Sequence, residues 1–294
     1  MAKALCAKIT VLVDDYAGYD IRNLYGQHGL SIYIEYIDSR GKTHRVLFDT
    51  GQSAEAILHN AQLLGIDLSR VEVIVLSHNH YDHTGGLLDI LKKINKRIPI
   101  ILHPDALKPS IYLSSKYGIR SVGMPFSIRE VEKLGDIVPI RDSAEILPSM
   151  YFLGEIPRYR EDLANPIENL YIVINNELKP HSLKDDTGIA IDIEGLGQII
   201  ISGCSHSGIV NIAKHSEKIV GDNIYAIIGG LHLVQVSKEK ISETINYLRK
   251  ELDVKEVHIG HCTGLKAEYL FLEEYKDKFF KISSGYSTEF GKIL

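Results

Sequence analysis

The hydrophobic residues of this chain recur in two spacings. Short apolar or alternating runs, typical of β-strands, are separated by segments in which apolar residues return every three or four positions, as on one face of a helix. The strand-like runs lie at residues 8–13, 30–37, 44–48, 71–76, 98–102, 187–203 (a hairpin turning at 195–197), 224–228 and 254–259. The helix-like segments lie at residues 53–64, 87–94, 209–219, 238–251 and 265–276. This alternation predicts an α/β protein.

Residues 103–170 interrupt the pattern. The segment holds Tyr112, Tyr117, Tyr151 and Tyr159 and most of the prolines, with little helical periodicity. It is either an insertion that forms a lid or specificity wall, or a set of additional strands of the main sheet. We find no linker or repeat that divides residues 1–294, so we expect a single domain with this possible insertion.

Composition narrows the class of function. The net charge is -5 and no basic run exceeds Lys92-Lys93, which argues against a nucleic-acid surface. No apolar run approaches the length of a membrane span, and no signal peptide precedes the first strand. Three cysteines cannot form a disulfide framework. We therefore expect a cytoplasmic protein that acts on a small molecule, with its oligomeric state left open.

The densest chemistry lies at residues 77–86, Ser-His-Asn-His-Tyr-Asp-His-Thr-Gly-Gly, between a predicted strand and a predicted helix. In an extended segment His78 and His80 point the same way and can reach one divalent metal ion together. Asp82 and His83 lie on the turn into the helix and suit a second ion, roughly 3.5–4 Å away. The alternative is a solvated polar loop.

The same arrangement occurs at four places. Apolar strands end in a small turn that carries histidine near residues 76–86, 200–209, 224–233 and 254–264. Ligands of α/β proteins gather at the carboxyl ends of strands. We therefore expect the four turns to converge on one edge of the sheets.

These motifs resemble those of the metallo-β-lactamase superfamily, over nearly the whole chain. His78-Asn79-His80-Tyr81-Asp82-His83 is similar to its His-x-His-x-Asp-His signature. The resemblance implies a four-layer αβ/βα sandwich with a metal site at one edge, between two sheets. It also implies that Asp49, in Phe48-Asp49-Thr50-Gly51, supports the metal loop, that Cys204 stands where most members have a bridging Asp, and that His261 is a late ligand.

Further segments resemble a narrower subgroup of metal-dependent hydrolases. They are His28-Gly29-Leu30-Ser31, Gly203-Cys204-Ser205-His206-Ser207-Gly208, Gly229-Gly230-Leu231-His232-Leu233 and His261-Cys262-Thr263-Gly264. That subgroup includes an archaeal enzyme of methanopterin biosynthesis that condenses a hydroxymethyl-dihydropterin diphosphate with a ribofuranosylaminobenzene phosphate. The resemblance does not choose between the two reactions.

The chain departs from the superfamily pattern in two ways. The usual third-motif histidine is missing, and we expect His206 to replace it, with Cys204 or His181 as alternatives. The bridging Asp is also missing, so the second ion binds weakly or needs substrate phosphates unless Cys204 is a ligand. We expect one or two ions, with zinc first and magnesium, manganese or iron as alternatives.

Three further residues are candidates near the site. His28 precedes a strand and could face the cleft, and the neighbours Asp185 and Asp186 precede another strand, where they either bind metal or substrate or cap the strand. Cys262 is interpreted as a small buried hydrophobe.

The first functional hypothesis is a hydrolase of small anionic esters, including phosphoesters. A bound metal lowers the pKa of its water and supplies hydroxide, which Asp82 orients, while His232 stabilises developing negative charge. The alternative is the transferase reaction, in which an aromatic amine displaces diphosphate from the pterin. A di-iron redox protein is disfavoured because its relatives carry Glu at the position of His80.

Overall fold

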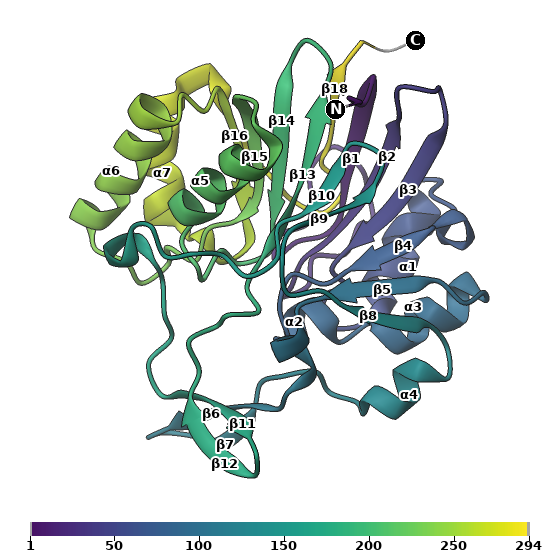
Figure 1. Cartoon of the computed structure of the whole chain (residues 1–294), viewed down its shortest axis with the longest axis vertical. Coiled ribbons are helices and arrows are strands. Elements are labelled where there is room, and N and C mark those ends of the chain that lie inside the picture. Colours follow the sequence, from purple (N-terminus) through teal and green to yellow (C-terminus); the bar gives the residue numbers. More distant parts are fainter. Residues whose placement is uncertain (1, 293–294) are drawn as a thin grey trace.

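The computed structural model describes residues 2–292, which form two seven-stranded sheets facing one another and a small third sheet (Figure 1). The strands of the first sheet lie in the order β18 (Ser287–Gly291), β1 (Cys6–Val13), β2 (Ser31–Ile37), β3 (Thr43–Phe48), β4 (Val73–Val75), β5 (Pro99–Leu102) and β8 (Asp136–Pro139). Those of the second lie in the order β17 (Phe279–Lys281), β16 (Glu256–Gly260), β15 (Ile224–Gly230), β14 (Gly197–Ser202), β13 (Gly188–Ile193), β10 (Met150–Phe152) and β9 (Ala144–Leu147).

Helices cover the outer face of each sheet (Figure 1). The first sheet carries α1 (Ala54–Leu63), α3 (Leu87–Ile94) and α4 (Ile128–Glu132), and the second carries α5 (Ile209–Val220), α6 (Lys238–Asn246) and α7 (Leu265–Tyr275). The short α2 (Tyr81–Thr84) precedes α3. The order of layers is helix, sheet, sheet, helix, which confirms the predicted αβ/βα sandwich.

The apolar residues form three clusters, one between the sheets and one beneath each helical layer. Alternate residues of strand β14 belong to two of these clusters. Ile199 and Ile201 lie in the cluster between the sheets, whereas Ile200 lies in the cluster under α5, α6 and α7. Successive strand residues point to opposite faces, so a strand covered on both faces reads as a continuous apolar run.

Several elements differ from the sequence prediction. Strand β4 spans only Val73–Val75, although the run from 71 to 76 is apolar and hydrogen bonds from Glu72 N and Leu76 N extend the ladder at both ends. The helix expected over 238–251 ends at Asn246 and continues as a π turn, Tyr247–Glu251. Strands β17 and β18 escaped prediction because the first is only three residues long and the second is mostly polar.

Residues 103–170 contribute to all three sheets. Strand β8 extends the first sheet, and β9 and β10 extend the second. The third sheet has four strands in the order β12 (Glu177–Pro180), β11 (Leu170–Ile174), β6 (Ser110–Ser114) and β7 (Gly118–Ser121). It projects from the sandwich (Figure 1). A lid role for this small sheet remains a prediction.

The small sheet is fastened to the His loop at its base. Asn79 Nδ2 donates to Lys108 O at 2.9 Å and to Ser110 Oγ at 2.8 Å, and Tyr81 N donates to Val122 O at 2.9 Å. Any displacement of this sheet would therefore pull on the segment that carries His78 and His80. Within residues 2–292, none of the helices has the length and apolar character needed to cross a bilayer.

Candidate metal centre

Loops at the carboxyl ends of strands from both main sheets bring the predicted donors together. The loop after β4 carries His78, His80, Asp82 and His83. The loops after β14, β15 and β16 carry Cys204 and His206, then His232, then His261. Their ligand atoms form overlapping groups, within each of which all atoms lie no more than 4.8 Å apart.

The first group consists of three imidazoles, those of His78, His80 and His206. The Nε2 of His78 lies 3.0 Å from the Nδ1 of His80, and the ring of His206 lies 5.0 Å from that of His78 and 5.1 Å from that of His80. Burial, reinforced for each residue by nearby histidines, lowers the pKa of His80 to about 3 and holds those of His78 and His206 well below the usual value. The three rings are therefore neutral at pH 7, the form that binds metal.

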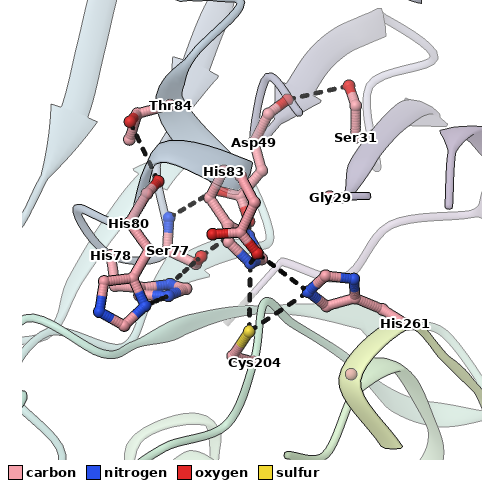
Figure 2. A network of polar contacts seen from close by, with 12 residues as sticks. Gly29, Ser31, Asp49, Ser77, His78, His80, His83, Thr84, Cys204 and His261 are labelled. Atoms are coloured by element: carbon pink, nitrogen blue, oxygen red, sulfur yellow. Dashed lines mark hydrogen bonds and ion pairs between the residues drawn. The ribbon is translucent and has the colours of Figure 1, made fainter. Parts of the chain in front are cut away.

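The second group consists of Asp82, His83, Cys204 and His261. Cys204 Sγ lies 3.1 Å from His83 Nε2 and 3.3 Å from His261 Nε2 (Figure 2). The Asp82 carboxylate lies 3.5 Å from the same two nitrogens. Burial would raise the pKa of Asp82, but His83 and His261 outweigh it and hold that pKa well below its usual value. The carboxylate is thus charged and faces two imidazoles and a thiol.

The two groups fit divalent metal ions. Among the described residues, His80 Nε2, both ring nitrogens of His206 and His232 Nδ1 are buried without a hydrogen-bond partner. Buried polar atoms without partners are costly, and so many in one place indicate a missing partner. Five imidazoles, a carboxylate and a thiol form a donor set that suits zinc or ferrous iron better than magnesium.

Asp49 and Ser77 support the His loop from behind. The Asp49 carboxylate accepts hydrogen bonds from Ser77 N, from Ser77 Oγ and from the Nδ1 of His83, each at 2.7 Å (Figure 2). Its bond to Nδ1 leaves the Nε2 of His83 directed at Cys204. A Cβ at Gly203 would lie 2.1 Å from Ser77 Oγ, so this glycine allows the second sheet to approach the His loop.

The predictions did not include Asp14 and Asp15, which hold His261. Asp14 Oδ1 accepts from His261 N at 2.8 Å, and Asp15 Oδ1 lies 3.1 Å from His261 Nδ1 and 3.2 Å from His28 Nδ1. The strand-end rule that found the histidines could have found both, because they directly follow β1. His28 joins Asp15 and His261 in a further group at the rim, with its side chain about half exposed.

Asp185 and Asp186 support the loops and lie outside the groups of potential ligands. Asp186 accepts hydrogen bonds from His206 N at 2.9 Å and Ser207 N at 2.7 Å, and Asp185 accepts from Asn79 N at 3.0 Å. His181 also lies outside these groups, and its Nε2 is 3.6 Å from Asp185 Oδ1. The geometry therefore favours His206 over His181 as the substitute for the third-motif histidine.

His232 lies next to the first group, and Cys262 lies next to His232 and Cys204. The ring of His232 lies 4.2 Å from that of His206, and its backbone N–H donates to Cys262 Sγ at 3.2 Å. Cys262 thus has a polar contact and, with Cys204 and His232, forms another group of potential ligands, contrary to its interpretation as a purely hydrophobic thiol.

Backbone conformation also marks the site. Asp49, Ser205, His232 and His261 have φ values of 59°, 59°, 46° and 47°, in the left-handed region that L-residues seldom adopt. Each follows directly or closely on a strand end at the site. Such strain persists where the surroundings hold the residue in a functional orientation.

Comparison with known proteins agrees with this geometry. A model of the metallo-β-lactamase superfamily matches residues 25–215, a stretch that contains His78 to His206 and ends before His232 and His261. The 7,8-dihydropterin-6-methyl-4-(β-D-ribofuranosyl)-aminobenzene-5'-phosphate synthase of Methanocaldococcus jannaschii is 43% identical over 289 residues, 96% of each chain. An uncharacterized protein of the same organism is 30% identical over 88% of this chain and 91% of its own.

A solved structure extends the similarity to the whole fold. The crystal structure of a metal-dependent hydrolase of the β-lactamase superfamily superimposes with a TM-score of 0.82 and 28% identity, covering 97% of this chain and 100% of that one. The chain therefore belongs to the metallo-β-lactamase superfamily. It is an enzyme of that superfamily, and a named synthase is among its relatives.

Proposed function

We propose that this enzyme is a transferase that joins the methylene carbon of a hydroxymethyl-dihydropterin diphosphate to the amine nitrogen of a ribofuranosylaminobenzene 5'-phosphate and releases diphosphate. The similarity to the Methanocaldococcus synthase carries the proposal, since 43% identity extends over 96% of both chains and includes no large unmatched segment. Hydrolysis was the first expectation from the sequence, and the comparisons support the transfer alternative better.

The metals would be held by the first and second groups of potential ligands. We assign His78, His80 and His206 to one ion and Asp82, His83 and His261 to the other, with Cys204 as a further ligand of the second. When bound, such ions stabilise the negative charge of a diphosphate leaving group.

The chain's own groups place the reactants. In the reaction, the C–N bond forms as the C–O bond to diphosphate breaks, and the amine loses a proton. His232 Nδ1 is buried without a partner next to His206, which suits it to donate a hydrogen bond to a phosphate oxygen. The ionised Asp82 carboxylate lies 3.5 Å from the Nε2 atoms of His83 and His261, which suits it to share an ion with these two rings.

A cavity of about 700 Å³ beside the His loop suits the pterin. Tyr81, Met124 and Phe126 line it, together with Gln52, and aromatic and thioether groups pack well against a flat heterocycle. The four tyrosines of the insertion, Tyr112, Tyr117, Tyr151 and Tyr159, do not line this cavity.

The test is diphosphate release by metal-loaded enzyme given hydroxymethyl-dihydropterin diphosphate, with and without ribofuranosylaminobenzene 5'-phosphate. We expect release to require the arylamine and to match coupled product one to one. Release at the same rate without the arylamine would show that the enzyme hydrolyses the diphosphate ester. A His80→Ala variant controls for metal-independent breakdown of the substrate.

Hydrolysis remains a second candidate because of the whole-chain similarity to a metal-dependent hydrolase, at a TM-score of 0.82. The same ligand set can activate water for attack on a small phosphoester. Steady turnover of simple phosphodiesters or monoesters, with no effect of added arylamine, would favour this candidate.

A further inference from the structure

A second cavity, of about 520 Å³, is lined in part by His206 and shares no lining residue with the pterin-sized cavity beside the His loop. His206 belongs to its lining and is 1% exposed, so this buried ring is a point where the cavity meets the candidate metal centre. The lining also includes three cationic side chains, Arg141, Arg158 and Lys184.

Two of these cations share one carboxylate partner. Glu155 lies between them, 2.7 Å from Arg141 and 3.3 Å from Lys184. Within residues 2–292, Arg158 has no ion pair with a carboxylate side chain. Arg158 is therefore the cation of this lining that is available to an anionic ligand.

The guanidinium of Arg158 is held by two backbone carbonyls through one nitrogen and lacks a hydrogen-bond partner at another. Its Nη2 lies 3.1 Å from Ser182 O and 3.3 Å from Leu183 O, to which it donates. Its Nη1 is buried and has no partner among the described residues. A buried, unpaired donor is costly, and a rigid guanidinium matches the geometry of phosphate oxygens.

Arg158 is also linked to the loop that carries His206. Leu183 O, which accepts from Arg158, also accepts from Asp186 N at 3.2 Å, and the Asp186 carboxylate accepts hydrogen bonds from His206 N and Ser207 N. A phosphate bound at Arg158 would thus lie on the approach to His206. The rest of the same molecule could extend from there to the metals.

We propose that this cavity is a phosphate subsite, in which Arg158 anchors a phosphate group of the substrate while the reacting end lies at the metal centre. This deepens the proposed function and rests on it only for the identity of the substrate. Both a sugar phosphate and a diphosphate carry the required chemistry, so the test has one arm for each.

The experiment measures calorimetric binding of ribose 5-phosphate and of inorganic diphosphate to full-length, metal-loaded protein. Arg158→Gln should lower the affinity for ribose 5-phosphate roughly 10- to 100-fold at unchanged metal content, because hydrogen bonds to a charged group are lost. Arg158→Lys should recover part of the loss. Arg97→Gln, which removes a surface arginine paired with Asp136, is the matched control.

The two arms distinguish the source of the phosphate. Weaker binding of ribose 5-phosphate alone assigns the subsite to the sugar phosphate, and weaker binding of diphosphate alone assigns it to the leaving group. Wild-type affinity for both ligands in both Arg158 variants would overturn the proposal. If those variants do not fold, Glu155→Gln decides: freeing Arg141 and Lys184 should tighten binding, and unchanged affinity would overturn the proposal.

Activity separates this inference from the proposed function. In Arg158→Gln we expect the KM for the phosphorylated arylamine to rise at least tenfold, about the cost of one charged hydrogen bond, with kcat little changed. The same arylamine without its phosphate should not distinguish the variant from wild type. If no transfer occurs but the binding of ribose 5-phosphate still depends on Arg158, the proposed transferase function is wrong and the phosphate subsite is supported.

Discussion

The two halves of the metal centre are built differently. In the first sheet, His78, His80, Asp82 and His83 lie within six consecutive residues, so their spacing already fixes which donors face together. In the second sheet, Cys204 and His261 are 57 positions apart and lie 3.3 Å from one another. Their proximity depends on the parallel register of β14, β15 and β16, which pairs Ser202 with Gly229 and Gly230 with Gly260.

The difference teaches that the first half is a local motif and the second is a product of sheet packing. Gly203 and Gly230 show the consequence, because a Cβ at either would collide with Ser77 Oγ or with Cys262 Sγ. The first half, from the first sheet, should therefore lose metal binding when a donor is removed. The second half, from the second sheet, should lose metal binding also when the residues that hold its loops are changed.

The largest effect is expected from the local half. His80→Ala should lose metal from the first group and reduce activity by at least about 10³-fold, more than the usual cost of a single transition-state hydrogen bond. Metal content by mass spectrometry and circular dichroism would check this. The matched control is His59→Ala on α1, whose ring stacks on Tyr25 outside the centre. Full metal content in His80→Ala would remove the basis for the site.

Cys204 tests the unusual donor of the packed half. Cys204→Ala should weaken the second metal by more than the roughly 10- to 100-fold that loss of an outer-shell partner costs. Cys204→Asp should keep that metal but shift preference from zinc toward manganese or magnesium, because oxygen replaces sulfur. In cobalt-substituted protein, the thiolate-to-metal band should vanish in both variants and persist in Cys6→Ala. A band unchanged in Cys204→Ala would exclude Cys204 as a ligand.

Asp15 tests whether positioning matters in the packed half. Asp15→Asn weakens the contact to His261 Nδ1 and should lower affinity for the second metal by roughly 10- to 100-fold. Competition with a chromophoric chelator measures this affinity. Asp89→Asn, on the exposed face of α3, is the control. Equal affinities in the two variants would mean that packing alone orients His261.

The last prediction concerns folding stability, not metal binding, and is made at Asp185. Burial raises the pKa of Asp185 to about 7 from 3.8, so the metal-free folded protein binds more protons here than the unfolded chain between these values. Its contribution to stability is present at low pH and is lost as pH rises through 7. Asp185→Asn, which stays neutral, should therefore be more stable than wild type at pH 8, by at most about 4 kcal/mol.

Calorimetry of chelator-treated protein at pH 5 and pH 8 would measure this difference. The gain should shrink as the pH falls, because the wild-type carboxyl becomes protonated in the folded state. A gain of the same size at both pH values would show that the substitution acts through packing and not through charge.

Local pattern was sufficient for most of the fold. Helix α3 and strands β1, β2 and β3 lie where the spacing of apolar residues places them, because burial on one or both faces imposes that spacing. The strands of residues 103–170 could not be predicted from local pattern, because they pair with partners far along the chain. Strand β10 pairs with β13, and β6 with β11.

The sequence by itself determined the metal-binding class, because a ligand run of six residues encodes its own geometry. Only the tertiary structure decided what completes it. Asp14 and Asp15 meet His261 across more than two hundred positions, and Asp186 fixes the loop of His206. Such contacts follow from sheet register and from the facing of two sheets, which depend on the packing of the whole core and leave no periodic trace in the chain.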